Sequence, residues 1–528
     1  MDHTTSPEAT MPDFQPDEIH ELEYGVRLRS VGVSGRADEV RPGPAVGRPV
    51  RDAAPGAWPD ALADEGVPGD AAAILAAAVD EAEMRRELSL PVDDLTSSAA
   101  PGAGTRADEQ RPHLEVTVDA PDQGEGQVLL EVDETGVVRW HVSEAAETGR
   151  GTDRAGAVQI FRVPIEQVDV SAGPGDRGVI GFGVRKVLHL IRFPVQSAAA
   201  LAGELAVAWW ERWRRPYRLG LPTPDTFAEP VNGDGVTTGR LAELADKPFL
   251  LLVHGTFSQG RSAFHGLAQD TALLGELYRR YDGRVLLFDH PTLHVDPEVN
   301  ARWLLERLPD DRPLTFDVVT HSRGGLVARQ FLTEPLARAV GRPAPVIRTL
   351  VHVATPNAGT TLASADRLGS LLDAFTNLLS LLPDETVLVA IQGVLEVVKQ
   401  IATGVVGGLD GLAAMDPGGT WLRALNEMPI PSDTAVHAIT SDFEPTNASL
   451  AVKALDLLAD PLFGAANDLV VPTEGVYRAG AYVVRDPFVV PRANAVAHTT
   501  FFRDAEVRNQ LAKWLGDRQG TSSGQGRG

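Results

Sequence analysis

A serine stands at the centre of the segment that is most suggestive of chemistry. Residues 316–329 read FDVVTHSRGGLVAR, with β-branched residues before Ser322 and helix-favouring residues after it. A strand that turns sharply into a helix at a serine is a nucleophile elbow, which exposes the hydroxyl at the edge of a sheet. The positions two before and two after the serine must be small, because strand and helix nearly touch there. Gly324 meets this requirement, whereas Thr320 departs from it.

An apolar run that ends in His-Gly-Thr-Phe lies upstream, at residues 248–257. Attack of a serine on an ester carbonyl produces an oxyanion, and each of two backbone N–H groups can stabilise it by about 3–4 kcal/mol. We expect the amide after the nucleophile, that of Arg323, to be one donor. The amide of Thr256 is expected to be the other, with that of Phe257 as the alternative. His254 is expected to have a structural role, in hydrogen bonds to the loop.

Four segments together resemble the α/β-hydrolase superfamily, in its lipase and esterase branch. They are the His-Gly-Thr-Phe strand, VLLFDHPT at 285–292, the elbow THSRGG and LVHVATPNAG at 350–359. Bacterial triacylglycerol lipases and glycosylphosphatidylinositol inositol-deacylases carry similar strings in the same order. The resemblance covers residues 245–515. It implies an α/β fold with a mostly parallel sheet flanked by helices, and serine hydrolase activity.

The resemblance also implies the chain order of a catalytic triad, in which an acidic residue and then a histidine follow the serine. His352, His437 and His498 lie beyond Ser322. The first two fall within expected strands. His498 falls in a loop before the last expected helix, so it is the predicted general base.

Two aspartates are candidates for the acid that orients His498. Asp468, in Asn-Asp-Leu-Val-Val, resembles the Asn-Asp-Gly-Leu-Val string of bacterial lipases, although Leu469 replaces the glycine. Asp442 directly follows an expected strand, which is the position of the acid in the simplest version of the fold. We favour Asp468 and keep Asp442 as the alternative acid. Either carboxylate would hold the imidazole in the correct tautomer and stabilise the imidazolium.

Residues 362–414 are predicted to be an insertion of the hydrolase domain, with few charges. The stretches LLDAFTNLLSLL at 371–382 and VLVAIQGVLEVV at 387–398 have wide apolar stripes at helical spacing. Such helices would form either a lid over an acyl-binding cleft or a cap that completes the core. Charges at Glu396 and Lys399 interrupt the apolar run, which argues against a membrane span.

Composition restricts the partners and the location. The 528 residues include 72 acidic and 48 basic ones, and the net charge of −24 disfavours nucleic acid and anionic membranes as partners. The sequence has no cysteine, which excludes disulfides and thiolate metal sites. The N-terminus lacks the basic and apolar regions of a secretory signal, so a cytoplasmic location is predicted.

The first half of the chain lies outside the resemblance. Residues 1–110 are rich in Ala, Gly, Pro and acidic residues, which predicts a largely disordered region. Residues 111–175 alternate between polar and apolar and predict a small antiparallel β module, a candidate site for a protein partner. A tryptophan-rich helical connector is predicted at 176–244, and a flexible tail at 516–528.

The sequence therefore predicts a serine hydrolase that cleaves carboxyl esters, lipid-like ones, through an acyl-enzyme on Ser322. This chemistry requires no metal and no organic cofactor. A serine peptidase or amidase would use the same residues, so it is the nearest alternative among enzymes. A catalytically idle binding or scaffold protein on a hydrolase fold is the alternative from another class.

Overall fold

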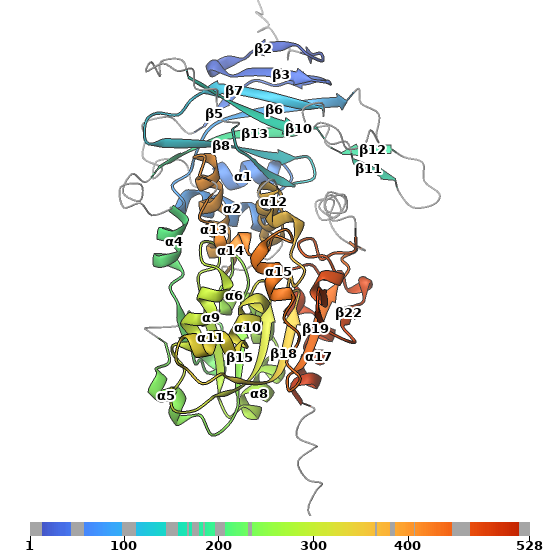
Figure 1. Ribbon diagram of the computed structural model, residues 1–528. Helices are drawn as coiled ribbons and strands as arrows, with labels where there is room; N and C mark the ends of the chain where they lie inside the picture. The colour runs from blue at the N-terminus through green and yellow to red at the C-terminus, as the bar shows by residue number, and fades with distance from the viewer. Residues whose placement is uncertain are drawn as a thin grey trace, which may run out of the picture. The chain divides into compact units, whose positions relative to one another are not determined.

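The computed structural model divides the chain into two compact units (Figure 1). Unit 1 comprises Met1–Ala198 and Leu395–Val405, and unit 2 comprises Ala199–Val394 and Val406–Gly528. The expected tail lies outside the described residues except for Gly516. The structure describes residues 13–43, 57–97, 112–143, 157–165, 168–171, 179–182, 185–195, 206–230, 235–364, 367–380, 386–405, 407–445 and 465–516.

Unit 1 is built from antiparallel sheets. The larger sheet has the order β1-β4-β6-β13-β8-β9, with β5 paired to β6, and the second has the order β10-β7-β3-β2. Their strands are β1 (Asp13–Phe14), β2 (Ile19–Glu21), β3 (Arg27–Val31), β4 (Val33–Ala37), β5 (Arg41–Pro42), β6 (Arg85–Ser97), β7 (His113–Asp119), β8 (Glu125–Asp133), β9 (Val138–His141), β10 (Val158–Pro164) and β13 (Lys186–Pro194). A separate ribbon pairs β11 (Val168–Ser171) with β12 (Val179–Phe182). Two α-helices, α1 (Ala57–Asp64) and α2 (Gly69–Glu81), and the short 3-10 helix η1 (Glu23–Gly25) complete the unit's described elements before residue 198.

The core of unit 1 uses the period-two pattern of its strands. Alternate residues of β6 and β7 are buried in one common cluster: Leu88, Leu90 and Val92, and Leu114, Val116 and Val118. This differs from the expectation for residues 1–110, because 13–43 and 57–97 form strands and helices. The expected connector also differs, since β13 is the strand between β6 and β8. Both differences have one cause: these strands pair with partners far away in the sequence, so local composition does not reveal them.

Unit 2 contains a seven-stranded sheet with the order β14-β16-β15-β17-β18-β19-β22. All neighbours pair in parallel except β14, which is antiparallel to β16. The strands are β14 (Arg218–Gly220), β15 (Phe249–Val253), β16 (Val285–Asp289), β17 (Thr315–His321), β18 (Val346–Val353), β19 (Ala435–Ser441) and β22 (Phe488–Val490). A short hairpin pairs β20 (Arg478–Ala479) with β21 (Tyr482–Val483).

Helices cover both faces of this sheet (Figure 1). The described helices that contain unit 2 residues are α4 (Ala206–Arg214), α5 (Thr238–Glu243), α6 (Gly260–Ala263), α7 (His265–Gln269), α8 (Thr271–Arg280), α9 (Pro297–Leu305), α10 (Gly324–Phe331), α11 (Glu334–Ala339), α12 (Leu368–Ser380), α13 (Thr386–Ala402), α14 (Asp410–Ala413), α15 (Thr420–Asn426) and α17 (Ala505–Gly516). In β15, Leu250 and Leu252 belong to the core shared with α8 and α17. Leu251 and Val253 belong to the core shared with α9 and α10. A strand buried on both faces explains the continuous apolar run in the sequence.

This arrangement is the α/β-hydrolase fold, with three layers and a strand–turn–helix at Ser322 between β17 and α10. The fold that the sequence resemblance implied is therefore confirmed. The insertion at 362–414 contains α12, α13 and α14.

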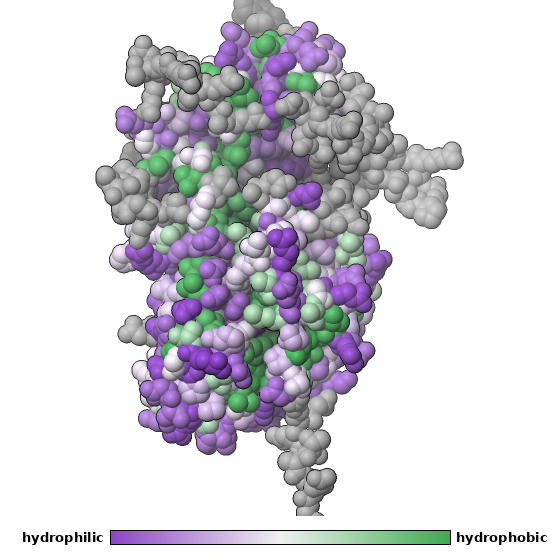
Figure 2. Space-filling model, viewed as in Figure 1, coloured by the Kyte–Doolittle hydropathy of each residue, from purple (hydrophilic) through white to green (hydrophobic). Residues whose placement is uncertain are grey.

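Among the described residues, no helix combines the length and the apolarity needed to cross a bilayer. Figure 2 shows hydrophilic side chains spread over the visible face of unit 2, with smaller groups of apolar ones between them.

Candidate active site

The turn that carries Ser322 has the strained geometry of a nucleophile elbow. Ser322 has a φ of 53°, in the left-handed region that residues with a side chain rarely adopt. Its N–H donates to the carbonyl of Val353 over 2.9 Å, which ties the turn to β18. A Cβ atom at Gly324 would lie 2.3 Å from the carbonyl oxygen of Val253. The close contact between α10 and β15 thus requires glycine at this position.

Thr320 departs from the expected small residue without leaving a polar group unsatisfied. Its hydroxyl is buried and donates to the carbonyl of Val351 over 3.2 Å. The hydroxyl of Thr355 lies 3.3 Å away. A Cβ atom at Gly325 would lie 2.2 Å from that same Thr355 oxygen, so the second glycine of the elbow makes room for these threonines.

The structure brings Ser322, His498 and Asp468 into one hydrogen-bonded chain. The Ser322 Oγ lies 2.9 Å from His498 Nε2, and His498 Nδ1 lies 2.8 Å from Asp468 Oδ2. All three side chains are buried. Since a carboxylate only accepts hydrogen bonds, Nδ1–H donates to Asp468, and the lone pair of Nε2 faces the serine hydroxyl. This is the arrangement in which an imidazole can take a proton from serine.

Asp468 is held in place by its own turn. Its Oδ1 accepts from the amides of Val470 and Val471 over 3.0 and 2.7 Å, which leaves Oδ2 for the histidine. Leu469, which replaces the glycine of lipases, has a φ of 77°. Its amide donates to Asn467 Oδ1 over 2.8 Å, a local contact that stabilises this conformation.

Asp442, the alternative acid, does not face His498 in the structure. It forms an ion pair with Arg492, whose side chain is 64% exposed. The two aspartates lie in different parts of the chain. Asp442 directly follows β19, whereas Asp468 lies in a turn in which its N–H donates to the carbonyl of Val471. The geometry therefore supports Asp468 rather than Asp442 as the orienting acid.

The His-Gly-Thr-Phe loop lies directly against Ser322. A Cβ atom at Gly255 would lie 2.5 Å from Ser322 Cβ and 3.0 Å from its Oγ, so only glycine fits there. Within the described part of the chain, the amides of Thr256 and Arg323 make no hydrogen bond. Two backbone donors next to the serine are thus available to a ligand, as an oxyanion hole requires.

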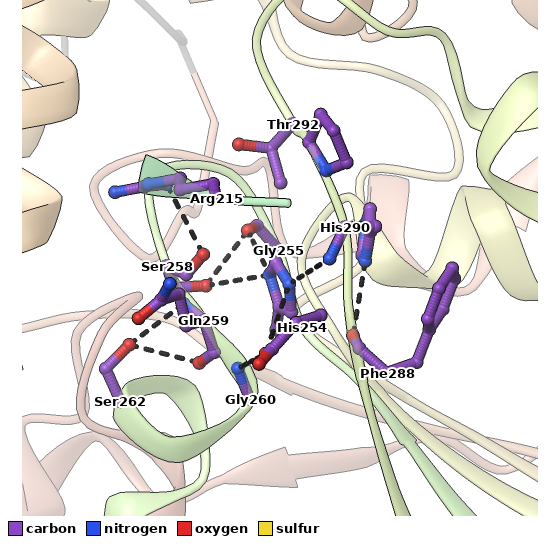
Figure 3. A network of polar contacts seen from close by, with 12 residues as sticks. Arg215, His254, Gly255, Ser258, Gln259, Gly260, Ser262, Phe288, His290 and Thr292 are labelled. Atoms are coloured by element: carbon purple, nitrogen blue, oxygen red, sulfur yellow. Dashed lines mark hydrogen bonds and ion pairs between the residues drawn. The ribbon is translucent and has the colours of Figure 1, made fainter. Parts of the chain in front are cut away.

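His254 stabilises this loop through hydrogen bonds of its ring (Figure 3). Its Nε2 accepts from the amide of His290 over 3.2 Å, and its Nδ1–H donates to the carbonyl of Gly255 over 2.9 Å. Burial lowers the pKa of His254 to about 3, so the ring is neutral and has one donor and one acceptor. Ser258 Oγ also donates to the Gly255 carbonyl over 2.9 Å. These contacts match the structural role expected for His254.

A second support of the loop, Arg215, was missed by the sequence analysis. Its buried Nη2 donates to the carbonyls of Phe257 over 2.8 Å and of Val389 over 2.7 Å. Its Nη1 donates to the carbonyl of Ser258 over 3.3 Å (Figure 3). Burial lowers the pKa of Arg215 to about 10, which leaves the guanidinium charged at neutral pH. Arg215 thereby joins helix α13 to the His-Gly-Thr-Phe loop, which is named the oxyanion loop below after its expected role.

Glu211, one helical turn earlier, anchors the loop that follows β16. Its buried carboxylate accepts from the amides of Thr292, Leu293 and His294 over 2.6 to 3.1 Å. Glu211 and Arg215 lie in the stretch that the sequence analysis interpreted as a connector. Charged residues in and next to a surface helix usually face solvent, so nothing in the local pattern reveals that these two are buried.

A small cavity of about 50 Å³ lies beside the triad. Its wall includes Thr256 of the His-Gly-Thr-Phe loop, and His321 and Thr499, which are adjacent in sequence to Ser322 and His498. The insertion supplies much of the apolar wall, with Phe375, Leu379, Val387 and Ala390. The Phe375 ring also packs edge-on against His498, with 6.0 Å between ring centroids.

A family model covers the part of the chain that holds these residues. It matches residues 214–516 and is described as a domain of unknown function, DUF7379. The chain belongs to the DUF7379 family. The matched part of this DUF7379 chain includes Arg215 and the predicted triad, whereas Glu211 precedes it. No curated protein matches the sequence.

Solved structures similar to this DUF7379 chain include lipase BlEst2 from Bacillus licheniformis, with 14% identity, a TM-score of 0.32, and coverage of 51% of this chain and 92% of that chain. Lipase 1 from Pelosinus fermentans has 14% identity and a TM-score of 0.31, and the match covers 51% of this chain and 99% of that chain. Phospholipase PlaB from Legionella pneumophila has 16% identity and a TM-score of 0.27, and the match covers 43% of this chain and 45% of that chain. At these identities and TM-scores the likenesses carry no inference about substrate.

We expect Arg215→Met to lower kcat on ester substrates by about 10²-fold, because loss of its hydrogen bonds would displace the oxyanion loop. KM should change much less, since the oxyanion donors act mainly in the transition state rather than on the bound substrate. Steady-state kinetics on short p-nitrophenyl esters would measure both values, and Arg215→Lys should recover part of the loss.

Arg214→Met is the matched control, because Arg214 is the exposed neighbour of the buried Arg215. A folded Arg215→Met protein with the kcat of the Arg214→Met control would show that the loop does not depend on this guanidinium.

Proposed function

We propose that this DUF7379 chain is a serine hydrolase that cleaves carboxyl esters through an acyl-enzyme on Ser322. The observation that carries the proposal is the buried chain from Ser322 to His498 to Asp468. The available amides of Thr256 and Arg323 support it, because the reaction needs donors where negative charge develops.

The reaction follows from the proton positions. His498 Nε2 accepts the proton of the Ser322 hydroxyl while Oγ forms a bond to the ester carbonyl carbon. The resulting oxyanion accepts hydrogen bonds from the two free amides. The bond to the alcohol oxygen then breaks, the alcohol takes the proton from His498, and the acyl group stays on Ser322. Water repeats the sequence with the acyl-enzyme, which releases the carboxylic acid and restores Ser322.

The insertion is proposed to form the wall of the acyl pocket and to act as a lid. Four of its side chains line the cavity, and Phe375 lies against His498. Ser322 is only 3% exposed, and a cavity of about 50 Å³ is far smaller than the 300 Å³ or more of ordinary ligand pockets. A lipid-like acyl chain would therefore require α12 to move away from the triad.

Two measurements test the proposal against its alternatives. A fluorophosphonate probe should label Ser322 in the folded protein, whereas a catalytically idle scaffold would not react. Matched p-nitrophenyl esters and p-nitroanilides of increasing acyl length should show faster cleavage of the esters. Faster cleavage of the anilides would assign the chain to the amidases and peptidases, and failure to label Ser322 would remove the serine mechanism. The suggestion of a protein partner for the β module stays a prediction.

A further inference from the structure

The wall of the cavity beside the predicted triad includes two buried side-chain atoms that have no hydrogen-bond partner among the residues that the structure describes. They are His321 Nδ1 and Thr499 Oγ1, and both residues line the cavity. A buried polar atom that stays unpaired costs about 1–3 kcal/mol, so such atoms in native proteins usually meet a ligand or a water molecule. These two atoms therefore indicate a position in the pocket that suits a polar group of a ligand.

The hydrogen bond on the other side of the His321 ring determines what Nδ1 can do. His321 Nε2 lies 2.8 Å from the carbonyl oxygen of His498, so Nε2 must carry the proton and donate. Burial lowers the pKa of His321 to about 3, which keeps the ring neutral. The remaining nitrogen, Nδ1, thus presents a lone pair and can only accept.

A hydroxyl group fits this pair of atoms better than an amine or a carboxylate. It can donate to His321 Nδ1 and accept from the Thr499 hydroxyl, and it brings no charge into a buried site. The apolar side chains of the wall, among them Phe257, Phe375 and Val387, are suited to the carbon atoms beside that hydroxyl. A cavity of about 50 Å³ holds only a few non-hydrogen atoms, so the hydroxyl must lie a few bonds from the reacting carbonyl.

We propose that His321 and Thr499 select esters that carry a hydroxyl group a few bonds from the scissile carbonyl. This inference rests on the proposed ester hydrolysis at Ser322 and specifies its substrate class. The hydroxyl can belong to the acyl part of the ester or to the alcohol part. The same chemistry recognises both, and the experiment separates them.

Two pairs of substrates, each differing by a hydroxyl in place of a methyl, provide the test on the full-length protein. Ethyl 3-hydroxybutyrate is compared with ethyl 3-methylbutyrate for the acyl part, and 2-hydroxyethyl butyrate with propyl butyrate for the alcohol part. In the pair that matches the pocket, kcat/KM should be at least about tenfold higher for the hydroxyl ester, as expected for one satisfied hydrogen bond.

Two variants show whether these atoms cause the preference. In His321→Gln the side-chain amide can replace Nε2 as the donor to the His498 carbonyl, but the Nδ1 acceptor is lost. The kcat/KM of the hydroxyl ester divided by that of its methyl partner should therefore fall to within about twofold of one. Thr499→Val should lower the ratio as well, and it leaves His321 in place should the first variant fail to fold.

The outcomes separate this inference from the proposed function. Esters hydrolysed without a preference in either pair would overturn the hydroxyl selection and leave the serine esterase intact, as would a preference that both variants retain. Absence of hydrolysis of all four esters, together with no fluorophosphonate labelling of Ser322, would instead overturn the proposed function.

Discussion

Replacement of Ser322 by alanine is expected to reduce ester turnover by at least about 10⁴-fold. In the proposed mechanism the Ser322 oxygen forms the acyl bond, while His498 takes its proton and Asp468 holds the imidazole in the required tautomer. The substitution removes one buried hydroxyl and keeps the Cβ atom of the side chain, so the fold should be retained. Steady-state turnover of a short ester and fluorophosphonate labelling would measure the loss.

Ser364→Ala is the matched control for this variant. Ser364 also belongs to unit 2, and its hydroxyl donates to the carbonyl of Thr361 rather than to the triad. This control should keep wild-type turnover and labelling. Turnover of Ser322→Ala within roughly tenfold of wild type would show that another residue is the nucleophile.

The second large effect is expected for Asp468→Asn, with a decrease in kcat of about 10²–10⁴-fold. The Oδ1 position accepts from the amides of Val470 and Val471, so an asparagine would keep its carbonyl oxygen there and turn its NH₂ group toward His498. The imidazole would then have to accept at Nδ1 and carry its proton on Nε2. That tautomer cannot take a proton from Ser322, which accounts for the size of the loss.

Asp442→Asn provides the comparison, because it is the same chemical change at the alternative acid. It would weaken an ion pair with the exposed Arg492, and such pairs contribute at most about 1 kcal/mol. We expect kcat to stay close to wild type. A larger loss of kcat for Asp442→Asn than for Asp468→Asn, with both proteins folded, would assign the acid to Asp442.

Local sequence was sufficient to predict the parts of the site that lie on one strand and its turn. The elbow at Ser322 and the His-Gly-Thr-Phe loop both consist of a buried strand followed by small residues, a pattern that is visible within about a dozen positions. The parallel sheet could also be predicted, because strands buried on both faces are continuously apolar. The resemblance to α/β-hydrolases then implied that an acidic residue and a histidine follow Ser322, and the position of His498 in an expected loop favoured it over His352 and His437.

The choice between two acids required the tertiary structure. Asp442 and Asp468 both follow plausible elements in the sequence, and only the path of the chain after β19 shows which carboxylate reaches His498. The protonated nitrogen of His321 likewise depends on a carbonyl that is far away in the sequence, that of His498. Hydrogen bonds between distant residues leave no periodic signal, so such details cannot be read from local patterns.

The strands of unit 1 and the burial of Arg215 could not be predicted from local sequence for the same reason. The strands β3, β4 and β6 are stabilised by partners elsewhere in the chain, and their own composition resembles that of a disordered segment. Arg215 is a charged residue that the sequence alone would place in solvent, yet it is buried because three carbonyl oxygens of two distant segments accept its hydrogen bonds. The sequence by itself determined which residues could do chemistry and in which order they occur. Only long-range packing decided how they are held, because burial and hydrogen bonding depend on neighbours in space.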